Sequence, residues 1–215
     1  SKEKLDMTMG LASTSAQNVI NNLGEQQLKS IIKTLGEEKE ASKIARNIVK
    51  ARSEKKITRV NELVAIIEKS KKRKFASKIN PSTKTFQALR IFVNKEITEL
   101  INGIINATKI LKPGGKILIV SFHSLEDKIV KYFFSNFSKN KSRPSRYLPE
   151  EDAQNTLFEK YVNKCIKPSE NEINNNNPSR SAKLRFATRS KNEFIYPTSL
   201  IQKFSKYLDL EAINA

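Results

Sequence analysis

The chain has 215 residues, of which 40 are lysine or arginine and 22 are aspartate or glutamate, so its formal net charge at neutral pH is +18. A charge of this size attracts polyanions, and nucleic acid is the first partner to consider. The length and a hydrophobic share of 38% are enough for one large domain or two modest ones. No run approaches the roughly 18 apolar residues of a membrane span, and no signal peptide is recognisable.

The sequence contains a single cysteine, Cys165, and a single histidine, His123. These numbers exclude an internal disulfide and a zinc site of the usual ligand set, so we expect no metal. Together with the missing signal peptide, they predict a cytoplasmic protein without membrane contact.

Residues 13–67 place apolar side chains at i, i+3, i+4 and i+7, the period of helices that show one face to a core. The spacing predicts four short amphipathic helices that form a compact helical subdomain. Residues 13–15 are N-cap candidates for the first helix, and Thr58 is the candidate for the fourth. Gly24 and Gly36 are the expected stops after the first and second helices.

A run of basic residues at 69–74 is expected to be a solvated loop unless it meets phosphate. After Asn80-Pro81, which cannot lie inside a helix, apolar spacing predicts one long helix over residues 86–104. That helix is expected to end at the Lys-Pro-Gly-Gly turn of residues 112–115.

The apolar period changes at residues 117–120, Ile-Leu-Ile-Val, which form a continuous run. Such a run is typical of a parallel strand buried on both faces. In the segment that follows, Ser124 and Asp127 resemble a capping box, and a helix with an apolar face comes next. A strand, a short turn and a helix predict an α/β crossover unit, whose turn lies at the edge of the sheet where ligands bind.

Two later segments predict strands, residues 162–166 weakly and residues 182–188 by the alternation of apolar and basic side chains. A polar loop joins them, which indicates a hairpin at the edge of the sheet. Beyond Ser190 the spacing predicts one more helix, with Ser199 as its cap.

Several segments together resemble the bacterial 16S ribosomal RNA cytosine-N4 methyltransferase family, known as RsmH or MraW. Leu5-Asp6-Met7-Thr8-Met9 is similar to the family's Leu-Asp-Met-Arg-Met, with Thr8 in place of arginine and Gly10 in place of the usual aspartate. Three further segments resemble family signatures, namely the one that starts at Asn80-Pro81-Ser82-Thr83-Lys84, Ser121-Phe122-His123-Ser124-Leu125-Glu126-Asp127, and Arg180-Ser181-Ala182-Lys183-Leu184-Arg185. The resemblance covers roughly residues 5–189.

The resemblance implies an α/β fold, namely the C-terminal half of a class I, Rossmann-like methyltransferase sheet with a small helical domain inserted. The expected division is a junction at residues 1–9, a helical RNA-recognition domain at 10–84, the methyltransferase part at 85–190 and a helical tail at 191–215. The implied function is N4-methylation of a cytidine in the decoding region of 16S ribosomal RNA, with S-adenosylmethionine as the methyl donor.

The family's glycine-rich loop and the acidic residue that holds the cofactor ribose precede its Leu-Asp-Met-Arg-Met segment, and this chain starts almost at that segment. Its six glycines contain no Gly-x-Gly. We therefore expect the main binding elements for S-adenosylmethionine to be absent from this chain, which would then bind the cofactor weakly by itself. Asp6 and Met7 are the expected pocket residues, because they lie where the family's two domains meet.

The catalytic candidates are Ser121, His123 and Glu126, all from the segment after the expected strand. Transfer to a cytosine amine needs an acceptor for the amine hydrogens and a well-positioned base. His123 orients the base or its phosphate, or it only bonds the adjacent turn. Glu126 accepts a hydrogen bond from the amine, or it is placed there by the helix dipole. Ser124 and Asp127 are expected to cap the helix.

The candidates for RNA contacts are basic or amide residues in three places: the basic run at 69–74, the start of the helix after Pro81, and the segment of the last strand. They are Lys71, Lys72, Arg73, Lys74, Asn80, Lys84, Gln87, Arg90, Arg180, Lys183 and Arg185. Two alternatives remain open. Asn80 and its neighbours cap the following helix, and the basic residues of the last strand protect an exposed sheet edge from aggregation.

A rival hypothesis from another class is a non-catalytic RNA-binding module, or one piece of a split or truncated methyltransferase. The missing Gly-x-Gly favours this rival, and the segment from Ser121 to Asp127 favours an enzyme. The expected partners are 16S ribosomal RNA or the small ribosomal subunit, and no membrane. The strand at residues 117–120 lacks enough neighbours in the sequence, so we also expect a homodimer or a partner that supplies the missing strands.

Overall fold

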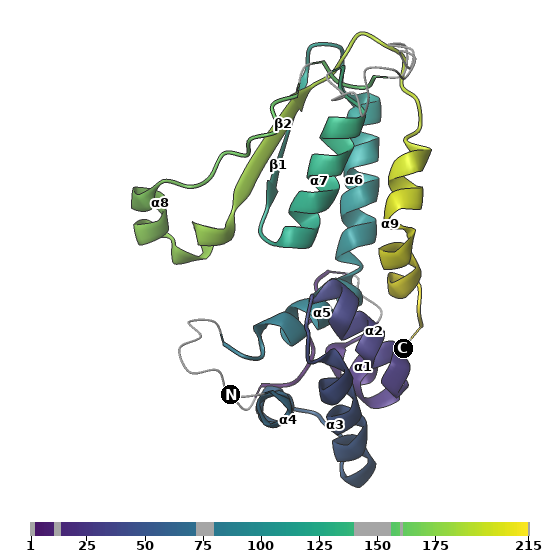
Figure 1. Ribbon diagram of the computed structural model, residues 1–215, viewed down its shortest axis with the longest axis vertical. Helices are drawn as coiled ribbons and strands as arrows, with labels where there is room; N and C mark the ends of the chain where they lie inside the picture. The colour runs from purple at the N-terminus through teal and green to yellow at the C-terminus, as the bar shows by residue number, and fades with distance from the viewer. Residues whose placement is uncertain (1–2, 11–13, 72–79, 140–155, 160, 215) are drawn as a thin grey trace, which may run out of the picture. The chain divides into compact units, whose positions relative to one another are not determined.

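The computed structural model describes residues 3–10, 14–71, 80–139, 156–159 and 161–214 (Figure 1). The chain divides into two compact units, which are treated separately below. Unit 1 comprises Ser1–Thr98 and Ser205–Ala215, and unit 2 comprises Glu99–Phe204. Unit 1 extends beyond the expected boundary at residue 84 because helix α5 packs against helices α1 and α2.

The four helices predicted before residue 71 are confirmed in unit 1. They are α1 (Ala16–Asn22), α2 (Glu25–Leu35), α3 (Ala41–Glu54) and α4 (Val60–Ser70). Ser15 caps α1 by accepting a hydrogen bond from the backbone N–H of Asn18 at 3.2 Å. Gly36 ends α2 as predicted, and a side chain there would collide with the backbone of α5, since a Cβ would lie 2.3 Å from the Lys84 carbonyl oxygen. The predicted cap of α4 is wrong by one residue, because Arg59 and not Thr58 occupies that position.

The single long helix predicted over residues 86–104 is wrong. Two helices are present, α5 (Thr83–Asn94) and α6 (Glu96–Ile110), and Lys95 between them adopts a left-handed conformation with φ of 49°. The Asn94 side chain donates to the Met7 carbonyl at 2.9 Å and accepts from the Met9 N–H at 2.6 Å. The apolar spacing continues across Lys95, so the period alone could not show a break that depends on contacts with a distant segment.

Unit 2 is built on an antiparallel pair of strands, β1 (Lys116–Ser121) and β2 (Lys183–Thr188), with Leu118 opposite Phe186. Helix α7 (Ser124–Asn136) packs along one face of this sheet (Figure 1). Helix α7 contributes Phe133 and Phe134 to an aromatic cluster, in which the Phe158 ring meets both rings edge-on at centroid distances of 5.3 and 5.2 Å. The sheet, one helical layer and this cluster give the unit a core on one side of the strands.

The prediction that residues 117–120 form a parallel strand buried on both faces is wrong. Strand β1 pairs antiparallel with β2, and Leu118 and Val120 are 60% and 52% exposed on the face away from α7. A continuous apolar run places apolar side chains on both faces of a strand, and this pattern predicts that both faces are buried. Among the described residues, only one face of β1 is buried. Within the described ranges β1 pairs with β2 alone, which agrees with the expected shortage of neighbouring strands.

The remaining elements are helix α8 (Glu170–Asn175), the 3-10 helix η2 (Asn177–Ser181) and helix α9 (Thr198–Glu211). The weak strand predicted at residues 162–166 is reduced to one antiparallel bridge between Ile166 and Leu184. The tail helix is confirmed as α9, which begins one residue before Ser199. None of the helices in the described part of the chain is both long and apolar enough to cross a membrane.

Candidate active site

The turn between β1 and α7 contains the three catalytic candidates. Ser121 ends β1 and is buried, and its hydroxyl lies 3.4 Å from the Lys183 carbonyl oxygen on the neighbouring strand. His123 is the N-cap residue of α7, and Glu126 is the third residue of that helix. The end of a strand and the start of a helix therefore hold all three positions in a fixed backbone.

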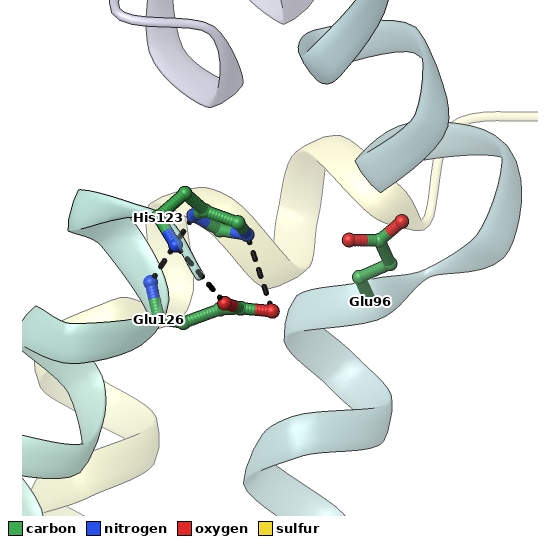
Figure 2. A group of neighbouring side chains, drawn as sticks. All are labelled: Glu96, His123 and Glu126. Carbon is green, nitrogen blue, oxygen red and sulfur yellow. Dashed lines mark hydrogen bonds and ion pairs between the residues drawn. The ribbon is translucent and has the colours of Figure 1, made fainter. Parts of the chain in front are cut away.

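His123 and Glu126 form a reciprocal capping box (Figure 2). The Nδ1 atom of His123 accepts from the backbone N–H of Glu126 at 3.4 Å, and its Nε2 atom lies 3.3 Å from Oε1 of Glu126. With Nδ1 as an acceptor, a neutral His123 carries its proton on Nε2. The other carboxylate oxygen accepts from the N–H groups of Phe122 and His123 at 2.8 and 3.3 Å.

The same contacts set the protonation of Glu126. Burial alone would raise the pKa of its carboxyl, but the His123 ring and the N–H groups of Phe122 and His123 outweigh that effect, so the pKa lies below its ordinary value. Glu126 is thus an ionised hydrogen-bond acceptor at neutral pH. The His123 side chain is only 8% exposed, so its first role here is to fix the turn.

The prediction that Ser124 and Asp127 cap α7 is wrong, because His123 occupies the cap and Glu126 completes the box. Imidazole nitrogens are less common caps than hydroxyl or carboxylate oxygens, so the sequence pattern favoured Ser124. Asp127 instead points to β2, where its carboxylate binds Arg185 at 2.6 Å and Lys183 at 3.0 Å.

This ion-pair network also occupies Arg185, a candidate for RNA contact. Its side chain is 6% exposed, and Nη1 donates to the Tyr161 hydroxyl oxygen at 2.8 Å and to the Asn163 carbonyl at 2.7 Å. Burial opposes ionisation of Asp127, yet Arg185 and Lys183 hold the pKa of its carboxyl below the ordinary value. The alternation of apolar and basic residues predicted that Arg185 and Lys183 lie on the same face of the strand. It could not predict that the Asp127 carboxylate of α7 lies opposite that face.

A cleft of about 340 Å³ opens beside the turn, at the carboxyl end of β1. We call it the β1-end cleft. Its lining comes from the turn, from residue 167 and from the segment that joins η2 to β2, and consists of Phe122, His123, Ser124, Lys167, Arg180, Ser181, Ala182 and Lys183. The structure thus brings His123 together with two of the predicted RNA contacts, Arg180 and Lys183. Glu126 and Arg185 do not line the cleft.

Phe122 and Lys167 line this cleft but were not predicted as site residues. Phe122 belongs to the Ser121–Asp127 segment, so its position was available from the sequence, but an aromatic residue after an apolar strand is ordinarily part of a core. Lys167 is separated from the turn by more than forty positions, and the spacing of residues gives no signal for that proximity.

The candidates for RNA contacts in unit 1 are mostly engaged by protein groups. Lys71 is largely buried and forms an ion pair with Glu38, and its contact with RNA stays a prediction. Arg90 binds the Glu96 carboxylate through two hydrogen bonds, at 2.7 and 3.0 Å. Lys72, Arg73 and Lys74 lie outside the described residues.

Three further candidates surround the start of α5. Asn80 stabilises the turn before this start, since its side-chain oxygen accepts from the N–H of Ser82, the N-cap residue, at 2.8 Å. Lys84 is exposed and donates to the Glu37 carbonyl at 3.0 Å, and Gln87 is half-buried on the first turns of the helix. The prediction that Asn80 caps α5 is wrong, because Ser82 occupies the cap position, and the RNA contacts of Asn80, Lys84 and Gln87 stay predictions.

The residues expected to contact S-adenosylmethionine do not form a cofactor cradle in unit 1. The Asp6 carboxylate is exposed and accepts from the Thr8 hydroxyl at 2.9 Å, and Met7 is held through its carbonyl by Asn94. Of the described glycines, Gly36 lies against helix α5, and a Cβ added at Gly10 would meet no atom within 4 Å outside the adjoining residues. No step of methyl transfer is therefore assigned to these residues, and the contacts of Asp6 and Met7 with the cofactor stay a prediction.

Comparison with known proteins tests the resemblance directly. The model of the MraW methylase family matches residues 1–190. Three similar curated proteins, each named ribosomal RNA small subunit methyltransferase H, come from Bartonella grahamii, Parvibaculum lavamentivorans and Bartonella quintana, with identities of 45%, 44% and 42%. The alignments cover 88%, 86% and 96% of this chain but 57%, 55% and 62% of those proteins, so the chain spans little more than half of their length. The resemblance predicted from the motifs is confirmed, and the chain belongs to the MraW methylase family.

Proposed function

We propose that this chain serves in S-adenosylmethionine-dependent N4-methylation of a cytidine in the decoding region of 16S ribosomal RNA. The observation that carries the proposal is the family match over residues 1–190, together with relatives named as methyltransferases of small-subunit ribosomal RNA. The net charge of +18 supports a polyanionic substrate.

In this proposal the chain supplies the C-terminal part of a Rossmann-like sheet and the RNA-facing helical domain. The position of the β1-end cleft supports the first role, because ligands of α/β sheets bind beyond the carboxyl ends of strands. Among the described residues β1 pairs with β2 alone, which supports pairing of its other edge with a further strand, and its exposed apolar face supports packing against a second copy or another polypeptide.

The residues of the β1–α7 turn contribute by positioning. Glu126 is an ionised acceptor that keeps the His123 ring in one orientation, with Nδ1 turned toward the helix and Nε2 toward the carboxylate. S-adenosylmethionine supplies the methyl group when it is bound. His123 at the lip of the cleft orients the base that receives this group, and Ser121 fixes the end of β1 to β2.

The proposal is tested by methyl transfer in vitro. The protein as its gene encodes it is incubated with methyl-labelled S-adenosylmethionine and small subunits from cells that lack the gene. We expect label in N4-methylcytidine of 16S ribosomal RNA. Label in another nucleoside, or none, would refute the assigned reaction.

A second candidate function is a non-catalytic RNA-binding module or one part of a split enzyme. The specific observation in its favour is the lack of a Gly-x-Gly sequence and of a glycine-lined cradle among the described residues. Calorimetric titration of this chain with S-adenosylmethionine distinguishes the two. Micromolar binding supports an autonomous enzyme, and no detectable binding combined with RNA binding supports the module.

A further inference from the structure

The β1-end cleft has a composition that the capping box does not explain. Lys167, Arg180 and Lys183 bring three cationic side chains to it, and none of the described residues that line it is acidic. Its volume of about 340 Å³ lies at the lower end of the ~300–1,000 Å³ typical of ligand pockets. The cleft therefore fits a small anionic group, such as one unit of a larger polyanion.

The three cations differ in how firmly the protein holds them. Lys183 is anchored by Asp127 at 3.0 Å, and Nη1 of Arg180 donates to the Asn177 side-chain oxygen at 2.8 Å. Lys167 is exposed and forms no ion pair with any residue in the described ranges. Arg180 and Lys167 thus keep hydrogen-bond donors available for an anion, whereas Lys183 contributes mainly its charge.

Phe122 adds an aromatic ring to this charged cleft. Its side chain is 53% exposed, although phenylalanine is ordinarily buried. Its backbone N–H donates to Glu126 at 2.8 Å, so the capping box holds the residue that presents the ring. An exposed ring beside cations is the combination with which proteins hold single-stranded nucleic acid, by stacking on a base and contacting the adjacent phosphates.

We propose that the β1-end cleft binds one nucleotide of single-stranded RNA, with its base stacked on Phe122 and its phosphates contacted by Lys167 and Arg180. This inference rests on the proposed function and specifies how the substrate strand is held at the end of the sheet. The groups recognised are the base and the phosphate, so single-stranded DNA of the same sequence binds with an affinity within a few-fold of that for RNA.

Phe122 also lies on the same side of β1 as the exposed side chains of Leu118 and Val120, and a protein partner could cover all three. The cations distinguish Phe122 from the other two, because Phe122 lines the charged cleft and Leu118 and Val120 do not. A strand of nucleic acid therefore fits the position of Phe122 better than an apolar protein surface does.

The chain contains no tryptophan, so a single introduced tryptophan reports on one position. In Phe122→Trp, an RNA of about eight nucleotides is expected to quench the fluorescence by stacking. The matched control is Leu118→Trp, which places the reporter on the same face of β1 but away from the cleft, and its fluorescence should not respond.

The second measurement is the RNA affinity of alanine variants of the cleft residues. Phe122→Ala is expected to weaken RNA binding about tenfold, the order of effect seen when one base loses its stacking partner. Lys167→Ala and Arg180→Ala should each lower the slope of log affinity against log salt by about one, whereas Lys116→Ala at the other end of β1 should not. Circular dichroism confirms that each variant is folded.

The outcomes separate this inference from the function on which it rests. RNA binding that is unchanged in Phe122→Ala, without quenching of the reporter in Phe122→Trp, overturns the cleft assignment and leaves the proposed function standing. If the fluorescence of Phe122→Trp changes with protein concentration instead of RNA, and sizing shows a larger mass, Phe122 belongs to a protein interface and the assignment is also overturned. No RNA binding by the unsubstituted chain contradicts the RNA-facing role in the proposed function, and the cleft assignment with it.

Discussion

The two faces of the β1–β2 sheet differ in burial and in charge. On the face that α7 covers, the Arg185 guanidinium is buried against Asp127, and the apolar side chains of Ile117 and Ala187 are buried on the same face. On the other face, the apolar side chains of Leu118, Val120 and Phe186 are exposed. In an ordinary two-layer domain the charges face water and the apolar side chains face the core.

The buried ion pair on one face and the exposed apolar side chains on the other both depart from this arrangement. A buried charge is tolerated only with partners, so the covered face depends on a specific set of hydrogen bonds. The exposed face contributes little to the folding of unit 2 within the described residues, and its apolar residues are available for contacts with other molecules. Substitutions on the two faces should therefore have very different effects.

The largest expected effect is that of Arg185→Ala on the covered face. It leaves the buried Asp127 carboxylate with Lys183 alone and should lower the free energy of unfolding by about 3 kcal/mol. Urea denaturation measures the change, and Lys164→Ala, at an exposed basic residue, is the control. A loss below ~1 kcal/mol would show that the network stabilises little.

The pH dependence of stability sharpens the same comparison. The folded-state pKa of Asp127 is lowered, so its contribution is present above the unfolded pKa of about 4 and is lost as pH falls through the lower folded value. Asp127→Asn should cost about 2 kcal/mol at pH 7, because the hydrogen bonds to Arg185 lose their charged acceptor.

This cost should shrink as the pH falls below about 4, because the Asp127 carboxyl of the unfolded chain takes up its proton there before that of the folded protein does. Thermal unfolding of both proteins between pH 7 and pH 3 provides the measurement. A constant difference in stability over this range would contradict the lowered pKa of Asp127.

A smaller effect is expected at the capping box. His123→Ala removes the acceptor of the Glu126 N–H and should cost about 1 kcal/mol, as the loss of an N-cap does. His123→Asn keeps a capping acceptor and should recover most of this stability. If both variants are equally destabilised, the ring contributes through packing, and the capping role is refuted.

The smallest effect on folding is expected on the exposed face. Leu118→Ser should change the free energy of unfolding by less than ~0.5 kcal/mol, as substitutions at exposed positions do. The same substitution should reduce self-association, measured by sedimentation or sizing, if this face is a protein contact. A strong loss of stability in a monomeric sample would mean that the face is covered within the chain.

The sequence predicted those features that depend on neighbours in the chain. The first four helices follow from apolar spacing, and Ser15 and Gly36 occur at the ends that local capping rules indicate. The turn at residues 121–127 was also recognised as the candidate site, because it joins a strand to a helix and matches a family signature.

Features that depend on distant contacts could not be predicted in this way. The break at Lys95 coincides with hydrogen bonds between Asn94 and the segment near Met7, more than eighty positions away. The burial of Arg185 requires Asp127 from another element, and Lys167 reaches the β1-end cleft only through the fold. Spacing along a strand assigns residues to a face, but it does not identify what lies opposite that face.

The proposed methylation of a cytidine in small-subunit ribosomal RNA is tested most directly on the RNA of the cell itself. 16S ribosomal RNA is isolated from cells with and without the gene, and its nucleosides are analysed by mass spectrometry. The account predicts that N4-methylation of one decoding-region cytidine is lost without the gene and restored by its return. An unchanged amount of that nucleoside in cells without the gene would contradict the account.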